Sequence, residues 1–101
     1  MKLKLTVAEF LALHDLLQRH ILAHRPKGIQ AHVLHGVLFR LFKKFYTKAL
    51  TAQQRYQVTM EADEACAFYM YFTKSPMTGE EVFTINLVHQ ITQKIHQTYS
   101  A

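Results

Sequence analysis

The sequence predicts a mostly α fold with a minor β part: a four-helix arrangement of two strand-helix-helix pseudo-repeats with a small two-stranded β ribbon. Two short alternating runs, at 2–5 and 56–60, each lead into a helix start, and a long amphipathic pattern follows in each half. Each half is also broken once by a proline and a glycine, at Pro26 and Gly28 and again at Pro76 and Gly79. We therefore expect a single domain, 1–101, with pseudo-repeat units of about 1–50 and 56–101.

The two halves agree in pattern more than in identity. Their offset changes by four residues inside the first helix of each unit, which is about one helical turn and preserves the buried face. We expect the units to be related by a pseudo-twofold axis. The alternative is that two amphipathic hairpins resemble each other by composition alone.

The first helix is predicted to begin at a capping box, with Thr6 as N-cap and Glu9 three residues later, and to run to about His24. Three-four spacing then marks a buried stripe of Val7, Phe10, Leu13, Leu17 and Ile21. The segment 25–28 ends the helix, because proline disfavours helical geometry in the residue before it and glycine permits a left-handed turn. A turn this short predicts an antiparallel hairpin.

The second helix is predicted over about 29–50. Its broad apolar face, which we expect to be central to the core, contains Ala31, Leu34, Val37, Leu38, Phe39, Leu41, Phe42, Phe45 and Tyr46. Gly36 interrupts this helix at a cost of about 1 kcal/mol relative to alanine. We therefore expect close packing of another backbone at Gly36.

The alternation at 56–60 predicts a half-buried strand that matches 2–5, and the two strands are expected to pair, antiparallel if the pseudo-twofold holds. Such a ribbon is only marginally stable alone. Packing on the helices, or joining the ribbon of a second copy, would support it.

The third helix is expected over about 61–73, although eight consecutive apolar or aromatic residues at 65–72 leave a strand as the alternative. We favour the helix, because the acidic residues before this run suit a helix start and make a poor hairpin turn. A helix that is apolar on all sides needs cover from more than one direction, so we expect a homodimer interface at Phe68, Tyr69, Tyr71 and Phe72. The fourth helix is predicted to start from Thr78 as N-cap, with Glu81 closing a capping box, and to run towards Tyr99.

Composition predicts a folded protein. Half of the 101 residues are apolar and 19% are charged, which is unlike a disordered chain. No apolar run approaches the ~18 residues of a membrane span, so we expect a soluble, cytoplasmic protein without a membrane partner. Cys66 is the sole cysteine, which excludes an internal disulfide.

Charge is divided unevenly. Residues 1–55 hold ten Lys or Arg and two acids, whereas residues 56–101 hold two Lys and five acids. A basic strip on the second helix, a candidate for nucleic-acid phosphates, contains Arg40, Lys43, Lys44 and Lys48. The alternatives are a solvated helix face, or pairing with the acidic second half, within one chain or across a dimer.

Histidines suggest a further chemistry. His20 and His24 lie four apart on one helix side, a spacing that lets two imidazoles share a metal ion, and His35 lies just across the turn. The glutamate of the metalloprotease signature is missing and no cysteine is near, so metal binding at His20, His24 and His35 is a minor alternative.

No catalytic signature is present: the sequence has no phosphate-binding loop, dinucleotide turn, nucleophile elbow or paired-cysteine motif. We predict a non-enzymatic binding or interaction protein without a cofactor. It is expected to self-associate as a homodimer, with a further protein partner possible. Nucleic-acid association and metal binding are the alternatives.

Overall fold

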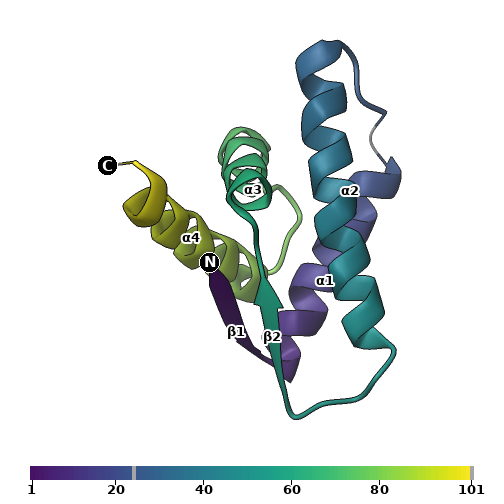
Figure 1. Ribbon diagram of the computed structural model, residues 1–101, viewed down its shortest axis with the longest axis vertical. Coiled ribbons are helices and arrows are strands. Elements are labelled where there is room, and N and C mark those ends of the chain that lie inside the picture. The colour runs from purple at the N-terminus through teal and green to yellow at the C-terminus, as the bar shows by residue number, and fades with distance from the viewer. Residues whose placement is uncertain (24, 101) are drawn as a thin grey trace.

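The computed structural model of this chain describes residues 1–23 and 25–100, and the predicted end of the first helix at His24 lies outside them. In the described residues the structure contains four helices and two short strands, which confirms the predicted fold class. Along the chain the elements are β1 (Lys2–Thr6), α1 (Val7–Ala23), α2 (Ile29–Ala49), β2 (Arg55–Thr59), α3 (Ala62–Lys74) and α4 (Val82–Tyr99). Figure 1 shows α1 and α2 as one hairpin, with α3 and α4 grouped on the other side of the molecule.

β1 and β2 pair antiparallel, as predicted, in a register that places Leu3 opposite Val58 and Leu5 opposite Tyr56. These four side chains are buried and their neighbours along each strand are exposed. This period of two is that of a half-buried strand. The core therefore covers the apolar face of the ribbon within one chain.

α1 begins at the predicted capping box. The Thr6 hydroxyl accepts the backbone N–H of Glu9 at 3.2 Å, and the Glu9 carboxylate accepts the backbone N–H of Thr6 at 2.9 Å. The buried side of α1 contains Phe10, Leu13, Leu16, Leu17 and Ile21. Placing Val7 in this stripe was wrong, since its side chain is 40% exposed. Gly28, with a φ of 89°, then turns the chain into α2 in a left-handed conformation that glycine adopts without strain.

α2 buries a narrower face than the sequence predicts. Leu38, Leu41 and Phe45 are buried, but Phe39 is 38% exposed and Tyr46 is 55% exposed. Placing these two aromatic side chains in the core was therefore wrong, because α1 and α3 cover one side of α2 and leave its flank open. The expected close packing at Gly36 was also wrong: this glycine is exposed, and among the described residues no neighbouring segment lies within 4 Å of where its β-carbon would stand.

α3 contains the whole apolar run 65–72, so the helical interpretation of this segment is confirmed. α2 packs on one side of α3 and α4 on another. This arrangement buries Ala65, Ala67, Phe68 and Phe72 inside a single chain.

α4 begins at Val82, so the predicted start at Thr78 was wrong. Gly79 has a φ of 84° and stands in a turn between the two positions. Because a right-handed helix requires negative φ, the helix starts only after this glycine, with Glu81 at the N-cap. The buried side of α4 contains Leu87, Val88, Ile91 and Ile95.

The order of elements repeats, since β1, α1 and α2 are followed by β2, α3 and α4. α1 spans 17 residues and α3 spans 13, a difference of about one helical turn. The pseudo-twofold relation between the halves stays a prediction. None of the helices in the described part of the chain combines the length and the hydropathy of a membrane span.

Candidate functional site

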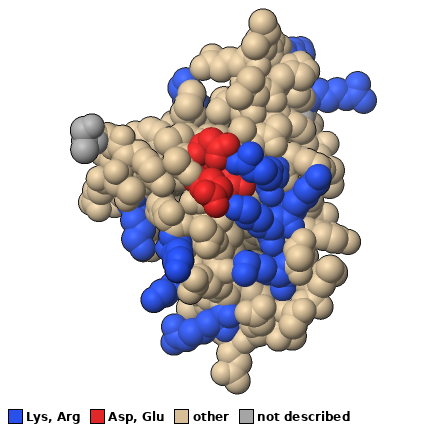
Figure 2. Space-filling view, viewed as in Figure 1, with Lys and Arg blue, Asp and Glu red and all other residues tan. Residues whose placement is uncertain are grey.

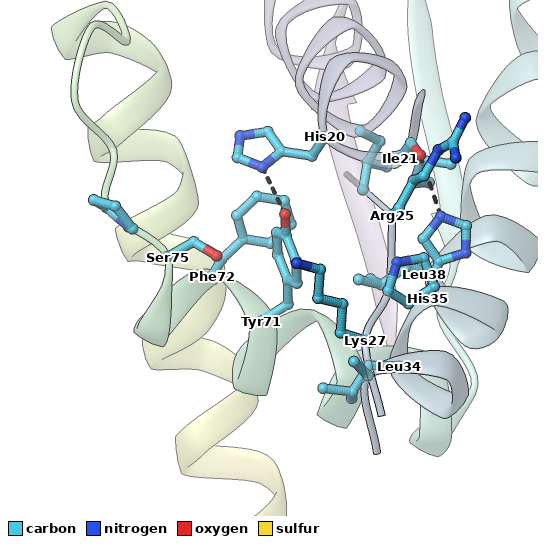
Figure 3. A pocket seen from close by; sticks show the side chains of 14 residues that line it. His20, Ile21, Arg25, Lys27, Leu34, His35, Leu38, Tyr71, Phe72 and Ser75 are labelled. Atoms are coloured by element: carbon cyan, nitrogen blue, oxygen red, sulfur yellow. Dashed lines mark hydrogen bonds between the residues drawn. The ribbon is translucent and has the colours of Figure 1, made fainter. Parts of the chain in front are cut away.

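A cavity of about 450 Å³ opens between the α1–α2 connection and the end of α3 (Figure 3). Its walls come from the second half of α1, the first half of α2 and the end of α3 with the segment that follows. The apolar wall residues are Leu17, Ile21, Pro26, Ala31, Leu34, Leu38, Phe72 and Pro76. Small-molecule sites have this size and character, with apolar walls and a few polar groups.

A chain of polar side chains braces one wall of the cavity. The Tyr71 hydroxyl of α3 lies 2.9 Å from Nδ1 of His20 in α1, as Figure 3 shows. Nε2 of the same imidazole lies 3.8 Å from a carboxylate oxygen of Glu80. The Arg19 guanidinium donates two hydrogen bonds to that carboxylate, at 2.9 and 2.8 Å. This bidentate pairing fixes the position of Glu80 and joins α1, α3 and the segment before α4.

The same contacts set the protonation of two groups in the chain. Burial raises the pKa of the Tyr71 hydroxyl, so this group stays protonated at neutral pH and acts through hydrogen bonds. The hydrogen bonds from Arg19 lower the pKa of Glu80, so its carboxylate stays ionised. This wall of the cavity therefore presents the neutral Tyr71 hydroxyl, with the ion pair of Arg19 and Glu80 behind it.

The entrance of the cavity is cationic. Arg25 and Lys27 are exposed on the α1–α2 connection, and in Figure 3 the Lys27 side chain points toward Tyr71. His35 also lines the cavity and donates from Nε2 to the backbone carbonyl of Ile21 at 3.2 Å. No Asp or Glu is found among the described residues that line the cavity.

The predicted metal ligands are only partly described. His20 and His35 both line the cavity, and each has one ring nitrogen in a hydrogen bond, to Tyr71 and to Ile21 respectively. His24 lies outside the described residues. Within 1–23 and 25–100, no group of three or more His, Cys, Asp or Glu is placed to hold a metal ion. A site that includes His24 stays a prediction.

The predicted nucleic-acid residues lie together on one face of α2. Arg40, Lys43, Lys44 and Lys48 line a shallow depression, and Figure 2 shows Lys and Arg side chains gathered beside a compact acidic group. The structure pairs two of these four cations with acids of α3: Arg40 with Asp63 and Glu64, and Lys44 with Glu64.

Glu64 holds a fully buried carboxylate at this junction, with 0% exposure. It accepts hydrogen bonds from Lys44 at 2.6 Å, from Arg40 at 3.1 Å and from the backbone N–H of Glu61 at 2.8 Å. Burial acts to raise the pKa of this carboxyl, but these donors outweigh burial and its pKa lies below the usual value. Sequence reasoning assigned Glu64 only to a helix start, because its burial depends on cations that a distant helix supplies.

The four predicted interface residues are divided between the core and the surface. Phe68 and Phe72 are 2% and 5% exposed, so their own chain covers them and they offer no surface to a partner. Tyr71 lines the cavity. Tyr69 is half-buried, with its hydroxyl 3.4 Å from Nδ1 of His96.

An apolar surface that the sequence reasoning missed is exposed along the outer side of the α1–α2 hairpin. On α2 the rings of Phe39, Phe42 and Tyr46 form a row, with neighbouring centroids 6.1 and 6.2 Å apart. On α1, His14 stacks on Phe42 with centroids 5.6 Å apart, so the two helices contribute to one surface.

His14 also belongs to an aliphatic stripe on α1. Leu11 follows Val7 by four residues, His14 follows Leu11 by three, and Leu22 follows His14 by eight. These spacings place Val7, Leu11 and Leu22 on the same side of the helix as His14. They are 40%, 53% and 69% exposed. We define the hairpin face as Val7, Leu11, His14, Leu22, Phe39, Phe42 and Tyr46. The apolar face predicted for α2 is too broad for neighbouring helices to cover completely. This breadth was the signal in the sequence that part of the face is exposed.

Comparisons of this chain with protein-family models, with curated proteins and with solved structures found no match.

Proposed function

We propose that this chain is a non-enzymatic binding protein that works as a homodimer, with the hairpin face as the interface between two copies. The observation that carries the proposal is the exposure of these aromatic and aliphatic side chains on one side of the hairpin. Large apolar patches on a soluble chain mark interaction sites. Aromatic side chains such as Phe39 and Tyr46 are also enriched where proteins associate.

Electrostatics favours a second copy as the occupant. The chain has a net charge of +5, so two copies repel one another at long range, and a contact surface without charges adds no further repulsion at short range. The hairpin face contains no Lys, Arg, Asp or Glu, and burial lowers the pKa of His14, which keeps this imidazole neutral at neutral pH. Closing the face against itself therefore buries no charge of its own members. Lys43, whose ammonium lies over the Phe39 ring, is exposed and can keep its charge in water at the rim, so the cost of burying an unpaired charge is avoided.

The face is also complementary to itself. Its aliphatic residues lie on α1 and its aromatic rings lie on α2. A twofold axis parallel to the two helices lays α1 of one copy antiparallel on α2 of the other, so each aliphatic row meets an aromatic row. The product is a four-helix bundle closed by an isologous interface.

Light scattering after size exclusion, over a range of protein concentrations, tests the proposal. We expect a dimer for the unaltered chain and a monomer for Tyr46→Glu, which introduces an unpaired charge at the interface. Val82→Glu is the matched control, because Val82 is 72% exposed on α4 and lies outside the hairpin face; this variant should remain a dimer. A strict monomer at every concentration of the unaltered chain would exclude the dimer.

A second function, association with nucleic acid, is favoured by the clustering of the basic residues on α2. Lys43 and Lys48 belong to this cluster, and neither has an ion pair within the described residues. Lys43 lies over the Phe39 ring, 5.0 Å from its centroid. If this function holds, Lys43→Glu with Lys48→Glu should reduce retention of a labelled RNA or DNA strand, and unchanged retention would exclude it.

A further inference from the structure

We propose that the cavity between the α1–α2 connection and α3 binds a small amphipathic anion, a single-chain carboxylate with its apolar tail inside and its charged head at the entrance. This inference does not depend on the proposed dimer, because the cavity and the hairpin face share no residue.

The walls of the cavity suit an unbranched apolar tail. Leu17, Leu38 and Phe72 are 1%, 3% and 5% exposed, so the core fixes this part of the wall. The half-buried Pro26, Ala31 and Leu34 supply the apolar surface that a ligand can reach. The volume of about 450 Å³ lies toward the lower end of the ~300–1,000 Å³ typical of ligand sites. A single short chain fits this space better than a two-chain lipid.

The wall opposite the α1–α2 connection is held in place before any ligand arrives. Tyr71 is tied to His20, and Glu80 behind them is clamped by Arg19. A site that needs little rearrangement loses less free energy on binding. These contacts therefore keep the cavity open, so that a ligand enters a preformed site.

The entrance determines the charge of the head group. Arg25 and Lys27 stand there as exposed cations, and no acid lines the cavity among the described residues. A carboxylate pairs with guanidinium and ammonium groups through charge-assisted hydrogen bonds. An ammonium head on the same tail is repelled at this entrance, and an uncharged alcohol gains no ion pair.

Isothermal titration calorimetry with octanoate, octanol and octylamine tests the proposal, because the three probes share a tail and differ in the charge of the head. We expect octanoate to bind at least tenfold more tightly than octylamine, with octanol between them. Hexanoate should bind more weakly than octanoate by about fourfold for each methylene removed, the factor that corresponds to about 0.8 kcal/mol per buried methylene. Raising the salt concentration should weaken octanoate binding, because exposed charges are screened.

Two variants and a matched control locate the site. Ala31→Trp fills the cavity and should abolish octanoate binding. If circular dichroism shows that this variant is unfolded, Leu34→Trp serves as the cavity-filling variant instead. Lys27→Glu should weaken octanoate binding about tenfold. Lys94→Glu makes the same change of charge at an exposed position of α4 and should leave the affinity within twofold.

Several results would overturn the proposal: no octanoate binding at millimolar concentration, equal binding of octylamine, or unchanged affinity in a folded cavity-filling variant. Tyr46→Glu separates this proposal from the dimer. The variant should bind octanoate normally even as a monomer, so failure of the dimer leaves the cavity result intact, and failure of octanoate binding leaves the dimer result intact.

Discussion

Replacing Glu64 by glutamine should destabilise the fold by about 2 kcal/mol at neutral pH. Removing one partner of a buried ion pair costs about 3–5 kcal/mol when the remaining charge is left in the core. Here the remaining side chains, Lys44 and Arg40, are 32% and 49% exposed, so both reach water and the loss is smaller. Glutamine also keeps an oxygen to accept the Glu61 N–H, which preserves the start of α3.

The loss should depend on pH. The pKa of Glu64 is lowered in the folded chain. Its ionised form therefore adds stability above the pKa of the unfolded chain, and this stability disappears as the pH falls through the folded value. The difference in unfolding free energy between the unaltered chain and Glu64→Gln should be largest at neutral pH and should shrink in acid.

Urea unfolding followed by circular dichroism measures both effects, with all samples at one protein concentration because association links stability to concentration. Asp63→Asn is the matched control: Asp63 also pairs with Arg40, but its side chain is 54% exposed, so we expect a clearly smaller loss of stability than for Glu64→Gln. The reasoning fails if the two variants lose the same stability at neutral pH, or if the loss from Glu64→Gln is unchanged in acid.

Three local predictions follow from backbone geometry and can be measured by the same unfolding experiments. Gly36→Ala should stabilise the chain by about 1 kcal/mol, because Gly36 is helical, exposed and surrounded by open space; destabilisation would mean that a second copy or another partner packs there. Gly79→Ala should destabilise it by about 1–2 kcal/mol, because the φ of 84° is strained for alanine, and an unchanged stability would contradict this turn. Thr6→Ala should cost about 1 kcal/mol, because it removes the hydroxyl that caps α1. An unchanged stability would contradict a stabilising role for this cap.

The parts of the fold that sequence could predict are those set by neighbouring residues. The Thr6 and Glu9 cap, the alternation of the strands and the three-four spacing of α1 are all local, so they identified these elements directly. The start of α4 was missed for a local reason too: a threonine with a glutamate three residues later resembles a capping box, but Gly79 between them takes a left-handed conformation.

The candidate sites depend on tertiary structure, which explains why sequence reasoning found their residues without their arrangement. His20, His35 and Tyr71 were each singled out, yet the cavity that they line forms only when α3 packs near the α1–α2 connection. Likewise, the spacing of Phe39 and Tyr46 marks an apolar side of α2, but only the packing of α1 and α3 decides that this side is left uncovered.

The charge difference between the two halves has a structural consequence. Cations of the first half pair with carboxylates of the second half. Such pairing within one chain was one of the alternatives predicted for the basic strip. The pairs are Arg19 with Glu80, Arg40 with Asp63 and Glu64, and Lys44 with Glu64. Two units of identical charge would place like charges at these junctions and repel one another. The opposite charges of the two halves therefore stabilise their packing against one another. Arg25, Lys27 and Lys43 lie outside these pairs within the described residues, so they remain available to anions from outside the chain. The cavity entrance and the open end of the basic strip are two places where such cations are exposed.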